Sequence, residues 1–189
     1  MSLFRFRPAI LLVALPMLLL SACSQVDLIH QKPVSELNIK AQNLLQQGNV
    51  DGALSRLEAA HDLAPNEPTT LFNLAVVNQM KGNDDEAIRL FEQLLAMPGQ
   101  DAGKIEYNLG IAYESQGDHL LAQKKPDEAL LAYKHALDAY QVVAGRPNPP
   151  AKLKDSIDFL QDKIAHPEKL NELTGLDDNA ASTSQVDPQ

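Results

Sequence analysis

The chain has 189 residues, with 25 acidic against 16 basic side chains, a net charge of −9 at pH 7, no tryptophan and one cysteine. The acidic balance, with no basic cluster, argues against a nucleic-acid-binding protein and against attraction to anionic lipid. One cysteine excludes an intramolecular disulfide framework. Few aromatic residues leave Leu, Ala, Ile and Val to build the core, which favours close-packed helices over a sheet sandwich.

Residues 1–22 have the composition of a secretory signal peptide. Arg5 and Arg7 make the N-terminal end basic, and the apolar run 9–20 follows them. This run is too short for a transmembrane helix, which needs about 20 residues, and Pro16 in its middle disfavours a membrane span further. The sequence therefore predicts an exported chain from which this segment is removed.

The tetrapeptide Leu-Ser-Ala-Cys at 20–23 resembles the lipobox of bacterial lipoproteins. The resemblance implies cleavage before Cys23 and acylation of that residue, so that several acyl chains anchor the protein stably. Ser24 stands where inner-membrane lipoproteins of this type carry Asp, which implies the periplasmic face of the outer membrane. Residues 23–33 would then form a lipidated tether. An ordinary cleavage site with an unmodified cysteine is the alternative.

An internal repeat follows the predicted tether. Small and apolar residues of a first copy recur at an offset of 34 residues in a second copy, and a third copy follows. The recurring residues are Leu37, Ala41, Leu44, Gly48, Ala53, Leu57 and Ala60, then Leu71, Ala75, Asn78, Gly82, Ala87, Phe91 and Leu94, then Leu109, Tyr113, Gly117, Ala129, Tyr133 and Ala136. The pattern resembles the tetratricopeptide repeat (TPR) family over roughly residues 34–143. The resemblance implies an all-α TPR solenoid of about three helix pairs.

Glycine, asparagine and proline residues mark the predicted helix ends. Gly48 and Gly82 end the first helix of two pairs, because glycine takes the left-handed C-cap conformation without a steric penalty. Asn83, with Glu86 three residues later, predicts a capping box for the next helix. The prolines that stop the second helices are Pro65 and Pro98.

The third copy is longer, with seven extra residues between Gly117 and Ala129. Pro126 suits the first turn of a helix, so we expect a helix boundary at 124–126. The first helix of this pair is then predicted to continue through Gly117 by two turns. The alternative ends that helix at Gly117 and leaves 118–125 as a loop.

A further amphipathic helix is predicted over 151–165, with one apolar face formed by Leu153, Ile157, Leu160 and Ile164. Such a helix would cap the last pair, because the end of a stack needs one apolar and one polar face. The predicted TPR domain therefore covers 34–165. Residues 166–189 are predicted to be a disordered acidic tail.

The TPR resemblance also implies a concave groove lined by the first helix of each pair. Its apolar positions are Phe72, Val76, Met80, Tyr107 and Ile111, flanked by Asn38, Gln42, Gln46, Gln79 and Glu114. Amide side chains can hydrogen-bond to a peptide backbone, so we expect a protein ligand that is an apolar peptide or an amphipathic helix. Lys104 is the only base among the groove positions, which argues against the carboxylate clamp of chaperone-binding TPR domains. The alternative is that Phe72 and Tyr107 pack inside the fold.

Catalytic, metal and cofactor motifs are not found in the sequence. The five histidines are scattered, with no two on one helix face at the spacing of a zinc site. The acidic run 84–86 is interpreted as a complement to a helix macrodipole. The sequence therefore predicts a protein that is not an enzyme and carries no cofactor other than covalent lipid on Cys23.

The predicted function is a lipid-anchored periplasmic adaptor. It would support assembly of an envelope complex such as a pilus or a secretion system, as the small pilotin-like TPR lipoproteins that the chain resembles do. Two alternatives are a scaffold for cell-wall hydrolases or proteases and the docking arm of an envelope enzyme. A third is self-association, with the groove taking a helix from a second copy of the chain.

Overall fold

The computed structural model describes residues 33–174, and this part of the chain is built from helices joined by short turns. A helix over 33–46 comes first. It is followed by α2 (Val50–Leu63), α3 (Pro68–Met80), α4 (Asp84–Leu95), α5 (Ala102–Ala122), α6 (Pro126–Ala144), α7 (Leu153–Ala165) and α8 (Pro167–Thr174). None of these helices is long and apolar enough to cross a membrane. The predicted signal segment, Cys23 and most of the tether lie outside the described residues.

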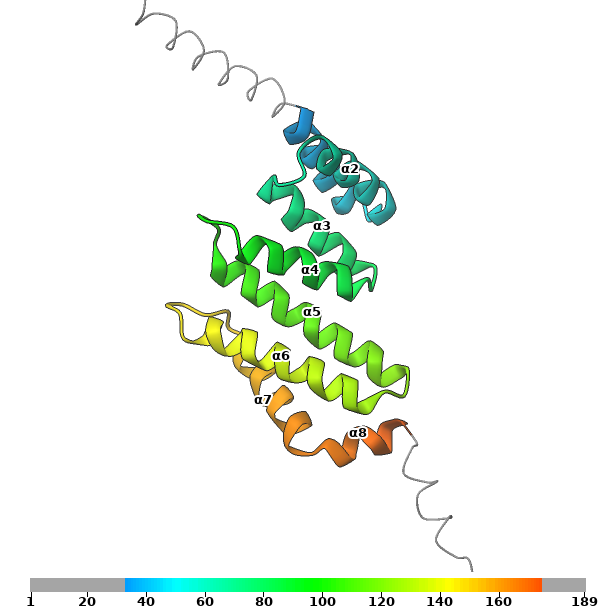
Figure 1. Ribbon diagram of the computed structural model, residues 1–189, viewed down its shortest axis with the longest axis vertical. Coiled ribbons are helices and arrows are strands. Elements are labelled where there is room, and N and C mark those ends of the chain that lie inside the picture. The colour runs from blue at the N-terminus through cyan, green and yellow to red at the C-terminus, as the bar shows by residue number, and fades with distance from the viewer. Residues whose placement is uncertain (1–32, 175–189) are drawn as a thin grey trace, which may run out of the picture.

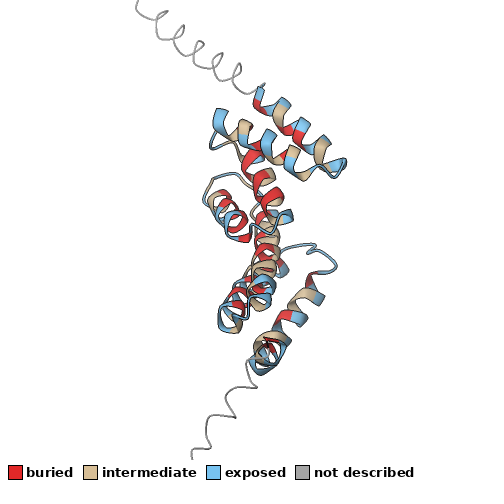
Figure 2. Ribbon diagram, turned by 90° about the vertical axis from the view of Figure 1, so that its right-hand side faces the viewer, coloured by how far each residue is buried: buried red, intermediate tan, exposed pale blue. Residues whose placement is uncertain are grey.

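The helices form antiparallel pairs that stack along one direction (Figure 1). The pairs are helix 33–46 with α2, α3 with α4, and α5 with α6, as the repeat predicts. Buried residues run along the interior of the stack (Figure 2) and form two clusters. The first cluster extends from helix 33–46 to α5, and the second joins α5 and α6 to α7 and α8.

The predicted glycine helix ends are confirmed. Gly48 and Gly82 both have φ of +75°, a conformation that glycine adopts without steric penalty. The predicted capping box is wrong, because the Asn83 side chain makes no cap hydrogen bond to α4. Asn83 Nδ2 instead donates to Asn78 Oδ1 at 3.1 Å. Glu86 accepts hydrogen bonds from the Arg89 guanidinium, so neither half of the box forms.

The long first helix of the third pair is confirmed, and the alternative loop over 118–125 is wrong. α5 runs without a break through Gly117 to Ala122. Lys124, with φ of 61°, makes the turn, and Pro126 opens α6 at the predicted boundary. Gly117 is buried inside the helix, where the Tyr133 ring of α6 lies against it and leaves no room for a β-carbon.

The predicted capping helix corresponds to α7, in which Leu153 and Leu160 are buried. The predicted start of the disordered tail is wrong, because α8 occupies Pro167–Thr174. One buried side chain, Leu170, packs against the second cluster, and α8 contacts α5, α6 and α7. The rest of the predicted tail, 175–189, lies outside the described residues.

Candidate protein-binding surface

A hollow of about 280 Å³ lies where the first helices of the three pairs meet. Gln42 of helix 33–46, Thr69 and Phe72 of α3, and Lys104 of α5 all line it. Three of them, Gln42, Phe72 and Lys104, occupy groove positions of their repeats. The structure therefore brings together, from three separate helices, side chains that the repeat pattern assigns to one concave surface.

Phe72 forms a wall of this hollow and is half-buried. One side of its ring packs edge-on against Phe91 of α4, with ring centroids 5.8 Å apart. The Lys104 Nζ lies 4.0 Å from the centroid of the same ring, a cation–π contact that holds an exposed ammonium over an aromatic face. The hollow thus combines the apolar ring of Phe72 with the positive ammonium of Lys104, which lies against that ring.

Asn38 differs from its predicted role as a free amide at the groove edge. It is buried, and its Nδ2 donates to the Val34 carbonyl at 3.1 Å and to Thr70 Oγ1 at 2.8 Å. Its Oδ1 accepts from Asn73 Nδ2 at 3.0 Å. Because these bonds use both ends of the amide, Asn38 ties helix 33–46 to α3 and is not available to a peptide.

Glu67 extends this network at the start of α3. Its Oε2 accepts hydrogen bonds from the Thr70 backbone N–H at 2.6 Å and from Thr70 Oγ1 at 2.8 Å, so it caps the helix. Partial burial would raise the Glu67 pKa, but the hydrogen bonds from Thr70 and Thr69 outweigh it and lower the pKa below its ordinary value. The carboxylate form is therefore favoured where the first two helix pairs join.

The other predicted residues of the first two repeats lie in different surroundings. Gln42 and Gln46 are exposed on helix 33–46 and present their amides to solvent. Val76 packs against the first cluster, and Gln79 has a buried Nε2 that finds no hydrogen-bond partner among residues 33–174. Met80, at the end of α3, is 57% exposed.

The predicted residues of the third repeat contact α6. Tyr107 and Ile111 are half-buried against the second cluster, and the Tyr107 ring lies 5.9 Å from that of Tyr140. Glu114 accepts a hydrogen bond from the Tyr140 hydroxyl at 2.9 Å. Burial and the nearby Glu114 charge raise the Tyr140 pKa well above its ordinary value. These groove residues therefore also support the fold, and Phe72 and Tyr107 rest on different core clusters.

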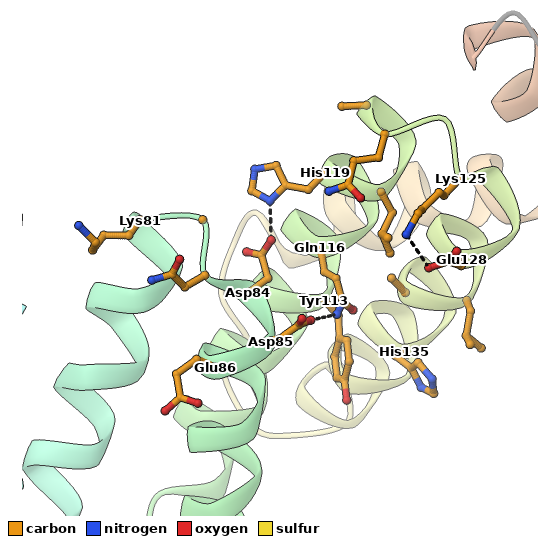
Figure 3. A pocket seen from close by; sticks show the side chains of 17 residues that line it. Lys81, Asp84, Asp85, Glu86, Tyr113, Gln116, His119, Lys125, Glu128 and His135 are labelled. Atoms are coloured by element: carbon orange, nitrogen blue, oxygen red, sulfur yellow. Dashed lines mark hydrogen bonds and ion pairs between the residues drawn. The ribbon is translucent and has the colours of Figure 1, made fainter.

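A larger hollow of about 1150 Å³, which sequence reasoning missed, lies between α4, α5 and α6 (Figure 3). It contains Asp84 and Asp85, which the sequence analysis assigned only to the helix macrodipole. Asp84 is buried and accepts a hydrogen bond from His119 Nδ1, while Gln116 Nε2 donates to Asp85 Oδ1 at 2.6 Å. Nothing in one sequence relates these partners, because they lie more than 30 residues apart.

Metal-ligating groups do not converge in the part of the chain that the structure describes. No set of three His, Cys, Asp or Glu side chains between 33 and 174 could hold a metal ion. The polar contacts in both hollows are instead single hydrogen bonds and ion pairs.

Comparison with known proteins identifies the repeat. Residues 44–118 match the family model described as tetratricopeptide repeat. The TPR domain of Sgt2 from Aspergillus fumigatus aligns with a TM-score of 0.52 and 18% identity, over 72% of this chain and 82% of that one. No curated protein matches the chain.

Two further solved structures are similar at lower scores. A mutant O-GlcNAc transferase from Thermobaculum terrenum aligns at 20% identity with a TM-score of 0.42, over 60% of this chain and 22% of that one. PilF from Pseudomonas aeruginosa aligns at 16% identity with a TM-score of 0.38, over 83% of this chain and 95% of that one.

The predicted fold class is confirmed: the structure is an all-α TPR solenoid. Solenoids of this kind present extended concave surfaces on which other proteins bind. The described part of this chain has that architecture, with a hollow shared by the first helices of its three pairs.

Proposed function

We propose that this chain is a lipid-anchored adaptor that binds a protein partner on its concave surface. The observation that carries the proposal is the hollow shared by the first helices of three consecutive pairs. An apolar side chain of the partner would contact Phe72, while the exposed amide of Gln42 would hydrogen-bond to the partner's backbone. The expected partner segment is an apolar peptide or an amphipathic helix.

The anchor in this proposal is supported by the sequence of the N-terminal segment. The apolar run and the lipobox-like tetrapeptide that ends at Cys23 favour acylation at the periplasmic face of the outer membrane. At roughly 3.3–3.6 Å per residue, a tether over 23–33 would let the solenoid reach on the order of 35 Å from the membrane. An adaptor held there would support assembly of an envelope complex such as a pilus or a secretion system.

The groove assignment is tested by site-specific photo-crosslinking in the native envelope from position 42, which lines the hollow. We expect one dominant captured chain, and Phe72→Ala should greatly reduce its yield. Val142→Ala is the control, because Val142 is 49% exposed on α6 and does not line the hollow. Equal yields from both variants, at unchanged helical content, would contradict the assignment.

The anchor is tested separately by Cys23→Ala. The wild-type chain should incorporate a clickable palmitate analogue and sediment with outer membranes, whereas the variant should incorporate none and leave the membrane fraction or stall before cleavage. Tight association of a cleaved Cys23→Ala chain with outer membranes would contradict anchoring by lipid.

A second copy of the chain is the alternative occupant of the groove. Analytical ultracentrifugation of the purified chain at micromolar concentration distinguishes the two cases. A monomer supports a different protein as partner. A dimer that Phe72→Ala dissociates would show that the groove serves self-association.

A further inference from the structure

The α4–α6 pocket, the hollow of about 1150 Å³ in Figure 3, is separate from the concave groove. It is formed by residues 81–86 in the α3–α4 turn and the first turn of α4, by 113–123 in the second half of α5, and by 125–135 around Lys125 and the first half of α6. None of the predicted groove residues lines it. A ligand in this pocket would therefore bind the solenoid independently of the groove.

Asp84 is the most unusual side chain of the α4–α6 pocket. It is only 6% exposed, although it is the first residue of α4, where the positive end of the helix dipole favours a carboxylate. Its Oδ2 accepts from His119, but its Oδ1 is buried and has no hydrogen-bond partner within residues 33–174. A buried carboxylate oxygen without a donor is unfavourable, so a ligand that supplies one would be stabilised.

His119 covers this carboxylate from α5. Its side chain is 51% exposed, and its ring lies against the backbone of Gly82, where a β-carbon would be 3.2 Å from Cε1. Figure 3 shows the ring next to Asp84 at the edge of the pocket. Because the imidazole is held from one side and faces solvent on the other, a rotation of His119 would free Asp84 Oδ2, the oxygen to which it bonds.

The other charges of the pocket leave it acidic around Asp84. Asp85 is exposed beside it and accepts one hydrogen bond, from Gln116. The two lysines at the rim, Lys81 and Lys125, are each already paired with a carboxylate. A cation that enters the pocket would therefore meet two neighbouring carboxylates.

The walls of the pocket suit a long side chain with a cationic end. Leu120 and Ala132 supply apolar surface, and Tyr113 and His135 form a pair of rings with centroids 5.1 Å apart. Such surfaces pack against the methylene stem of Arg or Lys. The guanidinium of Arg fits the polar end better than an ammonium does, because its planar fork donates to several carboxylate oxygens and is weakly hydrated.

We propose that the α4–α6 pocket binds an arginine side chain from a segment of a second protein partner. The guanidinium takes the place of the His119 ring on Asp84 and also contacts Asp85. The solenoid would then hold two proteins at once, one on its concave surface and one between its second helices. Arginine binding in this pocket goes beyond the proposed function and does not depend on it; only the simultaneous holding of two proteins rests on the proposed function.

The probe for this site is the blocked tripeptide N-acetyl-Ala-Arg-Ala-amide, titrated into the purified full chain while the ring signals of its isotope-labelled histidines are followed by NMR. The matched control peptide carries citrulline, which has nearly the shape of arginine but no charge. We expect the arginine peptide to shift the His119 signal in a saturable way and to leave that of His61 unchanged. The citrulline peptide should shift neither.

Variants assign the binding to individual carboxylates. Asp84→Asn and Asp85→Asn should each weaken binding of the arginine peptide, because each removes a charged hydrogen bond. The expected loss of affinity for Asp84→Asn is about tenfold. Asp138→Asn is the control, because Asp138 is an exposed residue of α6 outside the pocket and its change alters net charge equally. Phe72→Ala should leave this binding unchanged.

Three results would overturn the proposal: no shift at His119 with saturating peptide, equal effects of the arginine and citrulline peptides, or equal weakening by Asp85→Asn and Asp138→Asn. The third would show diffuse attraction to an acidic protein. Asp85→Asn serves as the test if Asp84→Asn does not fold, because Asp85 is exposed.

Discussion

The Tyr133 ring of α6 lies so close to Gly117 of α5 that a β-carbon on that glycine would be 2.4 Å from the Tyr133 Cε1. Gly110 has the same relationship to Tyr140, also at 2.4 Å. The two longest described helices therefore touch at two points where only a glycine fits. The Tyr133 hydroxyl donates to Asp118 Oδ1 at 2.7 Å, which fixes the ring over the glycine.

Gly117→Ala is expected to lower the free energy of unfolding by about 1–3 kcal/mol, because the added methyl group forces Tyr133 out of its position. In an unobstructed helix the same change would be stabilising by about 1 kcal/mol. Urea denaturation measures the difference. Gly103→Ala in the first turn of α5 is the control, since a β-carbon there meets only the end of the flexible Arg146 side chain, at 3.0 Å. A Gly117→Ala variant as stable as Gly103→Ala would show that the contact is not restrictive.

Glu67 gives a prediction about acid stability. Its folded-state pKa lies below the ordinary value of 4.5, because hydrogen bonds from Thr70 and Thr69 outweigh the effect of burial. Its contribution to stability is therefore fully present above about pH 4.5 and is lost as the pH falls through the lowered folded-state pKa. Glu67→Gln should cost about 1 kcal/mol at pH 7, a typical value for a helix cap, and much less at pH 3.

The measurement is urea denaturation of wild type and Glu67→Gln at both pH values. Glu58→Gln makes the same change of charge at an exposed position of α2 and serves as the control. A stability loss in Glu67→Gln that is the same at pH 3 as at pH 7 would mean that the carboxylate form of Glu67 is not what caps α3.

The helix pairs could be predicted from the sequence because their signals are local. Gly48, Gly82 and Pro126 each act on the backbone at their own position, and the repeat offset placed the small residues that let helices approach. The last described helix, α8, could not be predicted in this way. Eight residues with one buried leucine, Leu170, give no periodic pattern of their own, and α8 forms because α5, α6 and α7 already provide a surface for it.

The candidate sites were predictable only in part. The repeat pattern located Phe72 and Lys104, which the structure places on one hollow. It could not show that Asn38 bonds to Thr70, because an amide at a groove position looks the same whether its partner is a peptide or another helix. The contact between Asp84 and His119 could not be predicted either, because it depends on how α4 of one repeat packs against α5 of the next.

Asn38→Ala tests the assignment of that amide to the fold. Its removal leaves the Asn73 amide without its acceptor and takes away the donor to Thr70, so we expect a loss of about 1–3 kcal/mol in the free energy of unfolding. Gln42→Ala is the control, because Gln42 is exposed one turn later on the same helix, and it should change stability by no more than about 0.5 kcal/mol. Equal stability of the two variants in urea would indicate that Asn38 faces solvent.

Leu170 and Leu173 offer a matched pair for testing how α8 is held. Leu170 is 2% exposed and packs against the second cluster, whereas Leu173 is 72% exposed on the same helix. A helix of eight residues has little stability of its own, so it depends on its buried side chains, Leu170 and Thr174, of which Leu170 is the apolar one. Leu170→Ala should therefore remove about 2–3 kcal/mol from the local stability of α8, and Leu173→Ala almost nothing.

Hydrogen exchange of the backbone amides distinguishes local from global effects. Because α8 lies at the end of the described stack, Leu170→Ala should accelerate exchange within α8 by about 30-fold or more while amides of α3 and α4 keep their protection. The energy is lost locally, since the first core cluster contains no residue of α8. If exchange accelerated equally in α4 and α8, the stack would unfold as one unit and α8 would be an integral part of it rather than a docked cap.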